Sequence, residues 1–290
     1  MVGYACFLAA GYSLNSATMA IANKWALTQF PHSGTLTCLQ FGFSALVVLV
    51  LKGCHVLEAD SLNPKKVRAF MPAVIMFYIS IACNMRLLSR ATVDTFIVIR
   101  SVAPILTQVG EVVVLGADWP NRDAWLALLT ISMGAVGFAH NNLQAFADPH
   151  VLFWASTYLL CITADMLVVK RVITTIKLKP WGYVYYNNVL ALCVYPVWAL
   201  LTSETVGVTE GLFENWVSVA LSCVLGLGIS FLGLNTRLHL SATAFTVLGA
   251  ACKFLSIFLN TVLWRHHAPH PALPWLVLAL SGSLLYQRVT

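Results

Sequence analysis

Charged side chains are scarce in this sequence of 290 residues. Asp, Glu, Lys and Arg make up 10% of it, whereas they make up about 25% of a typical soluble domain. Hydrophobic residues make up 59%, and no polar stretch approaches the roughly 100 residues of a common soluble domain. These absences exclude a chain of soluble domains. We expect one integral membrane domain that spans residues 1–290.

Patterns typical of enzymes and metal sites are also missing. The chain has no H-E-x-x-H, G-x-S-x-G or phosphate-binding P-loop, and its eight cysteines include no C-x-x-C pair. His266, His267 and His270 share a short loop with prolines, which indicates a solvated loop. The net charge of +6 reflects the loops and does not predict nucleic-acid binding. We therefore expect no enzyme, no cofactor and no metal site.

Apolar runs long enough to cross the ~30 Å hydrocarbon core of a bilayer recur along the whole chain. They predict an all-α membrane protein with ten transmembrane helices. The expected spans are Tyr4–Leu27, Gly34–Leu51, Phe70–Leu88, Val93–Leu115, Ala124–Phe138, Val151–Val169, Gly182–Leu201, Trp216–Leu234, Ala242–Trp264 and Ala272–Tyr286.

The loop charges orient these spans. Ten crossings put both termini on one side, and with that side cytosolic, most of the 17 Lys and Arg residues lie in cytosolic connections. One loop on the opposite side holds Glu204, Glu210 and Glu214. This asymmetry fits the positive-inside rule. It predicts that both termini are cytosolic.

An internal repeat divides the spans into two halves. Six residues near the turn between the third and fourth spans recur near the turn between the eighth and ninth. The offset, 235 minus 84, is 151 residues throughout. A unit of five helices enters the membrane with opposite orientation in its second copy, as in many secondary transporters. We expect inverted repeats over about residues 1–140 and 150–290. The matched residues are Asn84, Arg86, Leu87, Ala91, Thr92 and Thr95 with Asn235, Arg237, Leu238, Ala242, Thr243 and Thr246.

Ionisable residues inside apolar spans are costly and therefore informative. Arg100 and Glu111 lie eleven residues apart in one span, which puts them on the same helix face, about 16 Å apart. Each could pair with another helix for structural reasons. The alternative is that this face lines a wet cavity, with Arg100 available to an anionic group.

Lys253 follows the small residues of Gly249–Cys252 in another apolar span. Gly and Ala allow a ligand or a helix to approach the backbone closely, and an ammonium one turn further on could hold a phosphate. The alternative is a packing seam with a lysine whose head reaches toward the interface.

The segment Trp181–Asn188 combines aromatic residues with two adjacent amides, Asn187 and Asn188. Amides suit the edge of a nucleobase or sugar hydroxyls, and tyrosine adds stacking surface and a hydroxyl. An interfacial aromatic belt could explain Trp181 and Tyr183, but it explains the two amides less well.

These motifs resemble those of the nucleotide-sugar transporters of the drug/metabolite transporter superfamily, in particular the GDP-mannose type. Tyr185–Asn188 is similar to the family's Phe-Tyr-Asn-Asn, and Gly249–Lys253 is similar to its Gly-Ala-Leu-Asn-Lys. Gly110-Glu111 and Asn23-Lys24 are also similar to the family pattern, and Arg100 stands where the family has Lys before the Gly-Glu pair. The resemblance implies substrate contacts from Lys24, Arg100, Tyr185, Tyr186, Asn187, Asn188, Gly249, Ala250 and Lys253.

The resemblance further implies exchange of a GDP-sugar for GMP across the Golgi membrane by alternating access. Its partners would be the nucleotide sugar, the nucleoside monophosphate and the bilayer, with a homodimer left open. Ala251 and Cys252 stand where the family has Leu and Asn, so the sugar stays open. A UDP-sugar or organic-phosphate exchanger of the same fold is the alternative. A membrane enzyme acting on lipid-linked sugars and a non-transporting scaffold rank lower.

Overall fold

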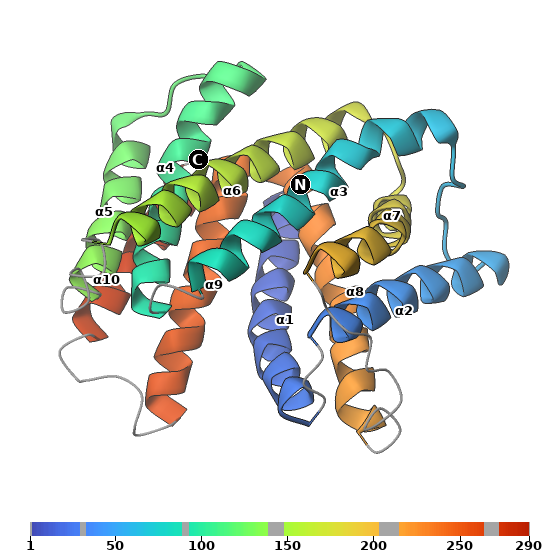
Figure 1. Cartoon of the computed structure of the whole chain (residues 1–290). Helices are drawn as coiled ribbons and strands as arrows, with labels where there is room; N and C mark the ends of the chain where they lie inside the picture. The colour runs from blue at the N-terminus through green and yellow to red at the C-terminus, as the bar shows by residue number, and fades with distance from the viewer. Residues whose placement is uncertain are drawn as a thin grey trace. The chain divides into compact units, whose positions relative to one another are not determined.

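The computed structural model describes residues 2–29, 33–88, 93–138, 148–202, 215–263 and 273–289. Within these ranges the regular elements are α-helices without strands (Figure 1). The acidic loop and the histidine loop singled out in the sequence lie outside the described residues. The helices are α1 (Val2–Gln29), α2 (Ser33–Gly53), α3 (Pro64–Leu88), α4 (Val93–Leu115), α5 (Arg122–Phe138), α6 (Pro149–Thr175), α7 (Pro180–Thr202), α8 (Trp216–His239), α9 (Ala242–Leu263) and α10 (Leu273–Val289).

Each expected span coincides with one of these helices. Among the described residues, six helices are long and apolar enough to cross a membrane: α1, α2, α3, α4, α6 and α8. This fits an integral membrane protein with several spans. That the remaining helices also cross the bilayer stays a prediction.

The largest difference at a helix start concerns α3, which begins at Pro64 and not near Phe70. The side-chain oxygen of Asn63 accepts a hydrogen bond from the backbone N–H of Lys65 at 2.9 Å, which is the geometry of a helix N-cap. Proline is favoured at the first helical position because its missing N–H would have no partner there. The basic residues after Pro64 therefore form a polar first turn that hydropathy alone does not reveal.

The chain forms two compact units, and each draws on both halves of the sequence. Unit 1 comprises Met1–Ile75 and Val172–His239, and unit 2 comprises Met76–Arg171 and Leu240–Thr290. In unit 1, α1 packs on α8, and α2 packs on α7 and α8. In unit 2, α10 packs on α5 and α9, and α4 packs on α5 and α9. Helices α3 and α6 each contribute residues to both units.

Small residues let α5 and α10 approach very closely in unit 2. A Cβ added at Gly134 would lie 2.6 Å from the backbone nitrogen of Ala279, and one at Gly282 would lie 2.9 Å from that of Ile131. Glycine at such positions is what allows two helix backbones to pack together in a membrane. Buried Ala127 and Leu276 continue the same contact.

A buried polar cluster joins three helices of unit 1. The side chain of Gln40 on α2 donates to Ser222 on α8 at 2.6 Å and to Asn23 on α1 at 3.1 Å. Ser222 also donates to Asn23 at 2.7 Å. Because an apolar surrounding offers no water, hydrogen bonds between helices satisfy polar side chains there. The cluster therefore fixes α1, α2 and α8 against one another.

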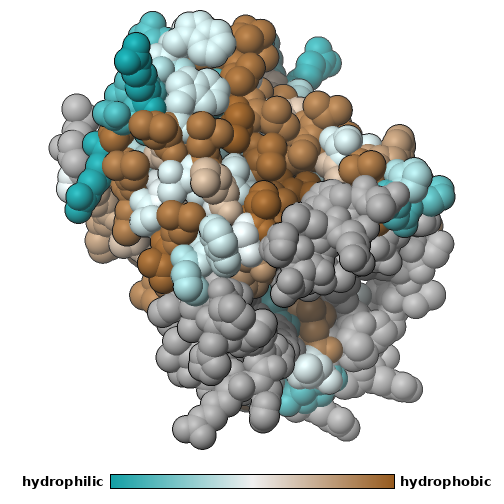
Figure 2. Space-filling view, turned by 90° about the vertical axis from the view of Figure 1, so that its left-hand side faces the viewer, coloured by the Kyte–Doolittle hydropathy of each residue, from teal (hydrophilic) through white to brown (hydrophobic). Residues whose placement is uncertain are grey.

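Large apolar side chains also cover outward surfaces. On α1, Phe7 is 69% exposed and Leu14 is 72% exposed, and Leu200 on α7 is 83% exposed. Figure 2 shows broad areas of hydrophobic side chains among the described residues on one face. Monomeric soluble proteins rarely expose such large apolar patches. We interpret these surfaces as lipid-facing.

Candidate functional site

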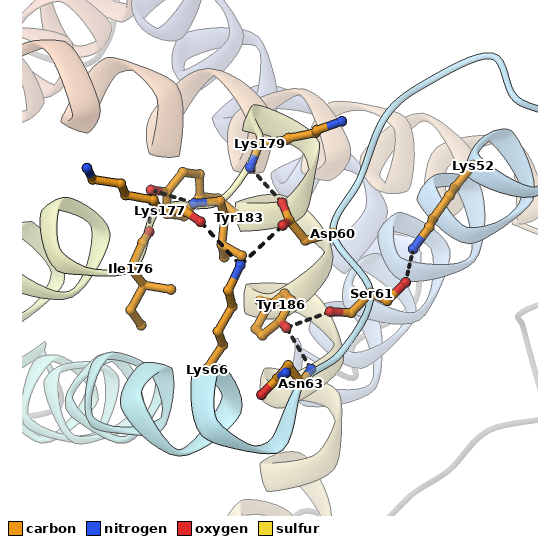
Figure 3. Close-up of polar contacts among 11 residues, drawn as sticks. Lys52, Asp60, Ser61, Asn63, Lys66, Ile176, Lys177, Lys179, Tyr183 and Tyr186 are labelled. Carbon is orange, nitrogen blue, oxygen red and sulfur yellow. Dashed lines mark hydrogen bonds and ion pairs between the residues drawn. The ribbon is translucent and has the colours of Figure 1, made fainter.

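The first turns of α7 carry the predicted Tyr185–Asn188 motif and lie in unit 1. Tyr186 is fully buried, and its hydroxyl donates to the carbonyl of Ser61 at 2.7 Å. The same hydroxyl accepts a hydrogen bond from the backbone N–H of Asn63 at 2.8 Å (Figure 3). Tyr186 therefore anchors the connection between α2 and α3. A contact between Tyr186 and a nucleobase would have to use its ring.

Asn188 is the motif residue with an unused polar atom. It is 1% exposed, and its Nδ2 donates to the carbonyl of Val184 at 2.8 Å within α7. Its Oδ1 is buried without a hydrogen-bond partner among the described residues. A buried acceptor without a partner is costly, so this oxygen is a candidate to accept a hydrogen bond from a ligand. Tyr185 and Asn187 are partly exposed.

Asp60 joins the α2–α3 connection to the segment before α7. Its carboxylate accepts hydrogen bonds from the backbone N–H of Lys179 at 2.7 Å and from Lys66 Nζ at 3.2 Å (Figure 3). An added Cβ at Gly182 would lie 2.6 Å from Asp60 Oδ2, so the approach requires glycine. Burial raises the pKa of Asp60, but these hydrogen bonds and positive charges outweigh it, and the pKa lies below its ordinary value.

A second tyrosine of the same segment has a structural partner. The hydroxyl of Tyr183 lies 2.6 Å from the carbonyl oxygen of Ile176 (Figure 3). It also lies 2.7 Å from the carbonyl oxygen of Ile173. These carbonyls belong to the end of α6, where helical hydrogen bonding leaves oxygens without partners. Tyr183 is buried. Its hydroxyl therefore binds carbonyl oxygens at the end of α6.

Arg100 lies on α4 in unit 2, between residues of two other helices. Its Nη1 donates to the hydroxyl of Tyr158 on α6 at 3.0 Å. Its Nη2 lies 3.7 Å from the position that a Cβ at Gly249 would occupy. The guanidinium therefore lies beside α9 at Gly249, at a distance where even a Cβ would make only an ordinary contact. Tyr158 is buried and was not predicted from the sequence, because no local pattern identifies it.

Lys253 lies one helical turn after Gly249 on α9, and its side chain is exposed. The positive charge of Arg100 acts unfavourably on that of Lys253. Among the described residues, neither side chain forms a salt bridge. Two cations beside small residues, without a carboxylate bound to them, suit an anionic ligand such as a diphosphate. Ala250 is buried next to Gly249.

Glu111 has a structural role in unit 2. Its carboxylate accepts hydrogen bonds from the backbone N–H groups of Ala242 at 2.6 Å and Thr243 at 3.1 Å, and the residue is 5% exposed. These groups begin α9, where a negative charge is favourable. Lys170 Nζ donates to the carbonyl of Leu240 at 2.7 Å beside it. Of the two interpretations of Glu111, the structure supports pairing with another helix.

The predicted site residues fall into two groups. Unit 1 contains Lys24 and the α7 motif, and unit 2 contains Arg100 with Gly249, Ala250 and Lys253. The side chain of Lys24 lies outside the described residues, while its neighbour Asn23 belongs to the buried polar cluster. Within unit 2 the structure brings Arg100 and the α9 motif together. Tyr158 and Asp60 are the further polar residues that it adds.

Comparisons with known proteins identify relatives over nearly the whole chain. The GDP-mannose transporter GONST3 of Arabidopsis thaliana is 38% identical over 98% of this chain and 78% of its own length. GDP-fucose transporter 1 of the same plant is 38% identical over 97% of this chain and 84% of its own. The GDP-mannose transporter of the yeast Scheffersomyces stipitis is 21% identical over 83% of this chain and 79% of its own.

A protein of known crystal structure shares the fold, with a TM-score of 0.71 at 14% sequence identity over 99% of this chain and 98% of its own. No protein-family model matches the chain. The full-length similarity to the two plant proteins nevertheless exceeds what a shared fold alone would produce. The chain belongs to the nucleotide-sugar transporters, in the group of the GDP-mannose and GDP-fucose transporters.

Proposed function

We propose that the chain is an antiporter that exchanges a GDP-sugar for GMP across the Golgi membrane. The observation that carries this proposal is the 38% identity, over nearly the full chain, to proteins named as transporters of GDP-mannose and of GDP-fucose. All the relatives described above that were found by sequence are named transporters, not enzymes. The sugar is mannose, fucose or a close relative, since both relatives are equally similar.

The proposed architecture is ten membrane-crossing helices in two inverted repeats. The bounds of the helices support the division into two repeats. When α5 (Arg122–Phe138) is moved on by 151 residues, it covers 273–289, which are the bounds of α10. The same shift takes α3 (Pro64–Leu88) to 215–239, within one residue of α8 (Trp216–His239). An odd number of helices in each repeat inverts the second copy. Ten crossings put both termini on one side, and the basic loops make that side the cytosol.

In this proposal the two groups of residues recognise different parts of the substrate. The buried Oδ1 of Asn188, together with Asn187 and the ring of Tyr185, contacts the guanine base. The guanidinium of Arg100 and the ammonium of Lys253 neutralise the diphosphate, and Lys24 adds a further cation. Gly249 and Ala250 leave room beside them for the sugar. The features that support this assignment are the Oδ1 of Asn188, which has no hydrogen-bond partner among the described residues, and Arg100 and Lys253, which form no salt bridge among them.

Exchange of the whole nucleotide sugar for the nucleoside monophosphate requires that the site open to one side at a time. Inverted repeats provide two related states for such alternating access. Because the GDP-sugar and GMP both contain guanine and phosphate, the same Asn and Arg contacts can bind the substrate in each direction of exchange. The sugar contacts would then distinguish import from return.

The test is exchange in proteoliposomes that contain the full chain. Vesicles loaded with GMP should take up GDP-mannose or GDP-fucose, and empty vesicles should take up at least tenfold less. Uptake of UDP-sugars or organic phosphates without uptake of any GDP-sugar would overturn the guanine assignment. Asn188→Ala should weaken selection for guanine over uracil, whereas Lys253→Ala should reduce uptake of every nucleotide sugar.

A further inference from the structure

Two thiols, one from α3 and one from α6, meet in unit 2. The Sγ of Cys83 on α3 donates a hydrogen bond to the Sγ of Cys161 on α6 at 3.5 Å. Nearby, Ser80 Oγ on α3 donates to the backbone carbonyl of Cys161 at 3.2 Å. This second contact links α3 to the α6 backbone at the same level. The two sulfurs therefore face one another where α3 and α6 meet.

All eight cysteines of the chain are free thiols in this structure. Cys83 is buried and Cys161 is partly exposed. Both lie in helices long and apolar enough to cross a membrane, so the oxidant must be a small neutral molecule that enters an apolar surrounding. A disulfide has an S–S length of about 2.05 Å, so the sulfurs would have to approach by about 1.5 Å.

We propose that Cys83 and Cys161 are a reversible dithiol/disulfide switch, with a peroxide such as hydrogen peroxide as the oxidant. Peroxide first oxidises the sulfur of the partly exposed Cys161 to a sulfenic acid and leaves as one molecule of water. The sulfur of Cys83 then attacks the sulfenic sulfur, and the hydroxyl departs with the thiol proton as a second water. In sum, two thiols and one peroxide give one disulfide and two waters. Exchange with a cellular dithiol restores both thiols.

The position of the pair suggests what the disulfide does. Helices α3 and α6 each contribute residues to both compact units, so they are the helices that pass from one unit to the other. A covalent bond between them fixes their packing in the state in which the bond forms. This consequence rests on the proposed alternating-access function, because a carrier must change helix packing in each cycle. We expect the disulfide to slow GDP-sugar exchange at least tenfold.

The experiment uses the purified full chain, in detergent and in proteoliposomes, with hydrogen peroxide as the probe. Digestion under non-reducing conditions should give one peptide pair that joins Cys83 to Cys161 and has lost two hydrogens. Treatment with dithiothreitol should separate the pair. The peptide pair should be absent from Cys83→Ser and from Cys161→Ser. It should persist in the matched control Cys223→Ser, which replaces a buried cysteine of α8.

Formation of the disulfide and its effect on exchange are tested separately. Absence of the Cys83–Cys161 peptide after peroxide, or pairing of either thiol with a different cysteine, overturns the disulfide. Formation of the peptide without loss of exchange in wild type overturns the switch. If untreated wild type exchanges no GDP-sugar, the proposed function fails, while the peptide analysis still decides whether the disulfide forms. In Cys83→Ser, exchange should be unchanged by peroxide.

Discussion

Glu111 provides the sharpest test of the packing in unit 2. Its carboxylate is buried, and it holds the first two backbone N–H groups of α9 through hydrogen bonds of 2.6 and 3.1 Å. Glu111→Gln keeps the shape of the side chain but removes the charge. The amide can offer one oxygen to one N–H group, while its NH2 group faces the other. The substitution therefore loses one charge-assisted bond and the favourable charge at the helix start.

The magnitude follows from these two losses. A hydrogen bond to a charged group contributes about 1.5–3 kcal/mol, and a charge at a helix terminus contributes about 0.3–1 kcal/mol, or up to about 2 kcal/mol when partly buried. Because these effects overlap, we expect a total of about 2 kcal/mol. A change of 1 kcal/mol shifts the midpoint of a domain of 150–250 residues by roughly 2–4 °C. Glu111→Gln should thus lower the Tm by about 4 °C.

The assay is thermal unfolding of the purified protein in detergent, followed by GDP-sugar exchange well below the Tm. Asp118→Asn is the matched control, because Asp118 is an exposed carboxylate outside the helices. Its Tm should stay within 1 °C of wild type, as an order-of-magnitude expectation for a surface change. A Glu111→Gln protein that keeps the wild-type Tm but loses exchange would refute the capping role. That result would instead indicate a carboxylate in the transport pathway.

Three further outcomes follow from contacts described above. Tyr158→Phe removes the hydroxyl that accepts a hydrogen bond from Arg100 at 3.0 Å. Loss of a hydrogen bond of about 1 kcal/mol should raise the KM for the GDP-sugar about fivefold in proteoliposomes. An unchanged KM would contradict a substrate contact by Arg100. Gly134→Ala places a Cβ 2.6 Å from a backbone nitrogen and should destabilise the protein by about 1–3 kcal/mol in thermal unfolding, whereas Gly42→Ala, which meets nothing within 4 Å, should not. The pKa of Asp60 is lowered in the folded state, so the stability that its carboxylate contributes is present at neutral pH and is lost as the pH falls below the ordinary value of 3.8. Asp60→Asn should therefore lower the Tm at pH 7 and make the Tm less sensitive to acid. An acid sensitivity equal to that of wild type would contradict the assigned ion pair.

Hydropathy was sufficient to predict where the helices lie. It works because a long apolar run must satisfy its backbone within a helix if it is to enter a membrane. It failed at the start of α3, where a polar first turn is set by the Asn63 cap and Pro64. Helical spacing also correctly placed Arg100 and Glu111 on one face, since both lie against α9.

The individual roles within the site were less predictable. Residue types alone suggested that Glu111 either pairs with a helix or lines a cavity, and only the fold brings the start of α9 to its carboxylate. Tyr158 and Asp60 were missed because their partners, Arg100 and Lys179, are 58 and 119 residues away in the chain. Contacts over such separations leave no periodic pattern in the sequence.

The hydroxyl of Tyr186 has a consequence for how mutational data on this motif are interpreted. Two residues of one helical turn have different roles. The Oδ1 of Asn188 has no hydrogen-bond partner among the described residues, whereas the hydroxyl of Tyr186 binds the backbone of Ser61 and Asn63. An alanine scan would record loss of activity at both positions and would not separate the two causes. Tyr186→Phe would separate them, because it keeps the ring and removes only the hydroxyl that binds the connection between α2 and α3. Membership in a signature motif is therefore not a measure of contact with the substrate.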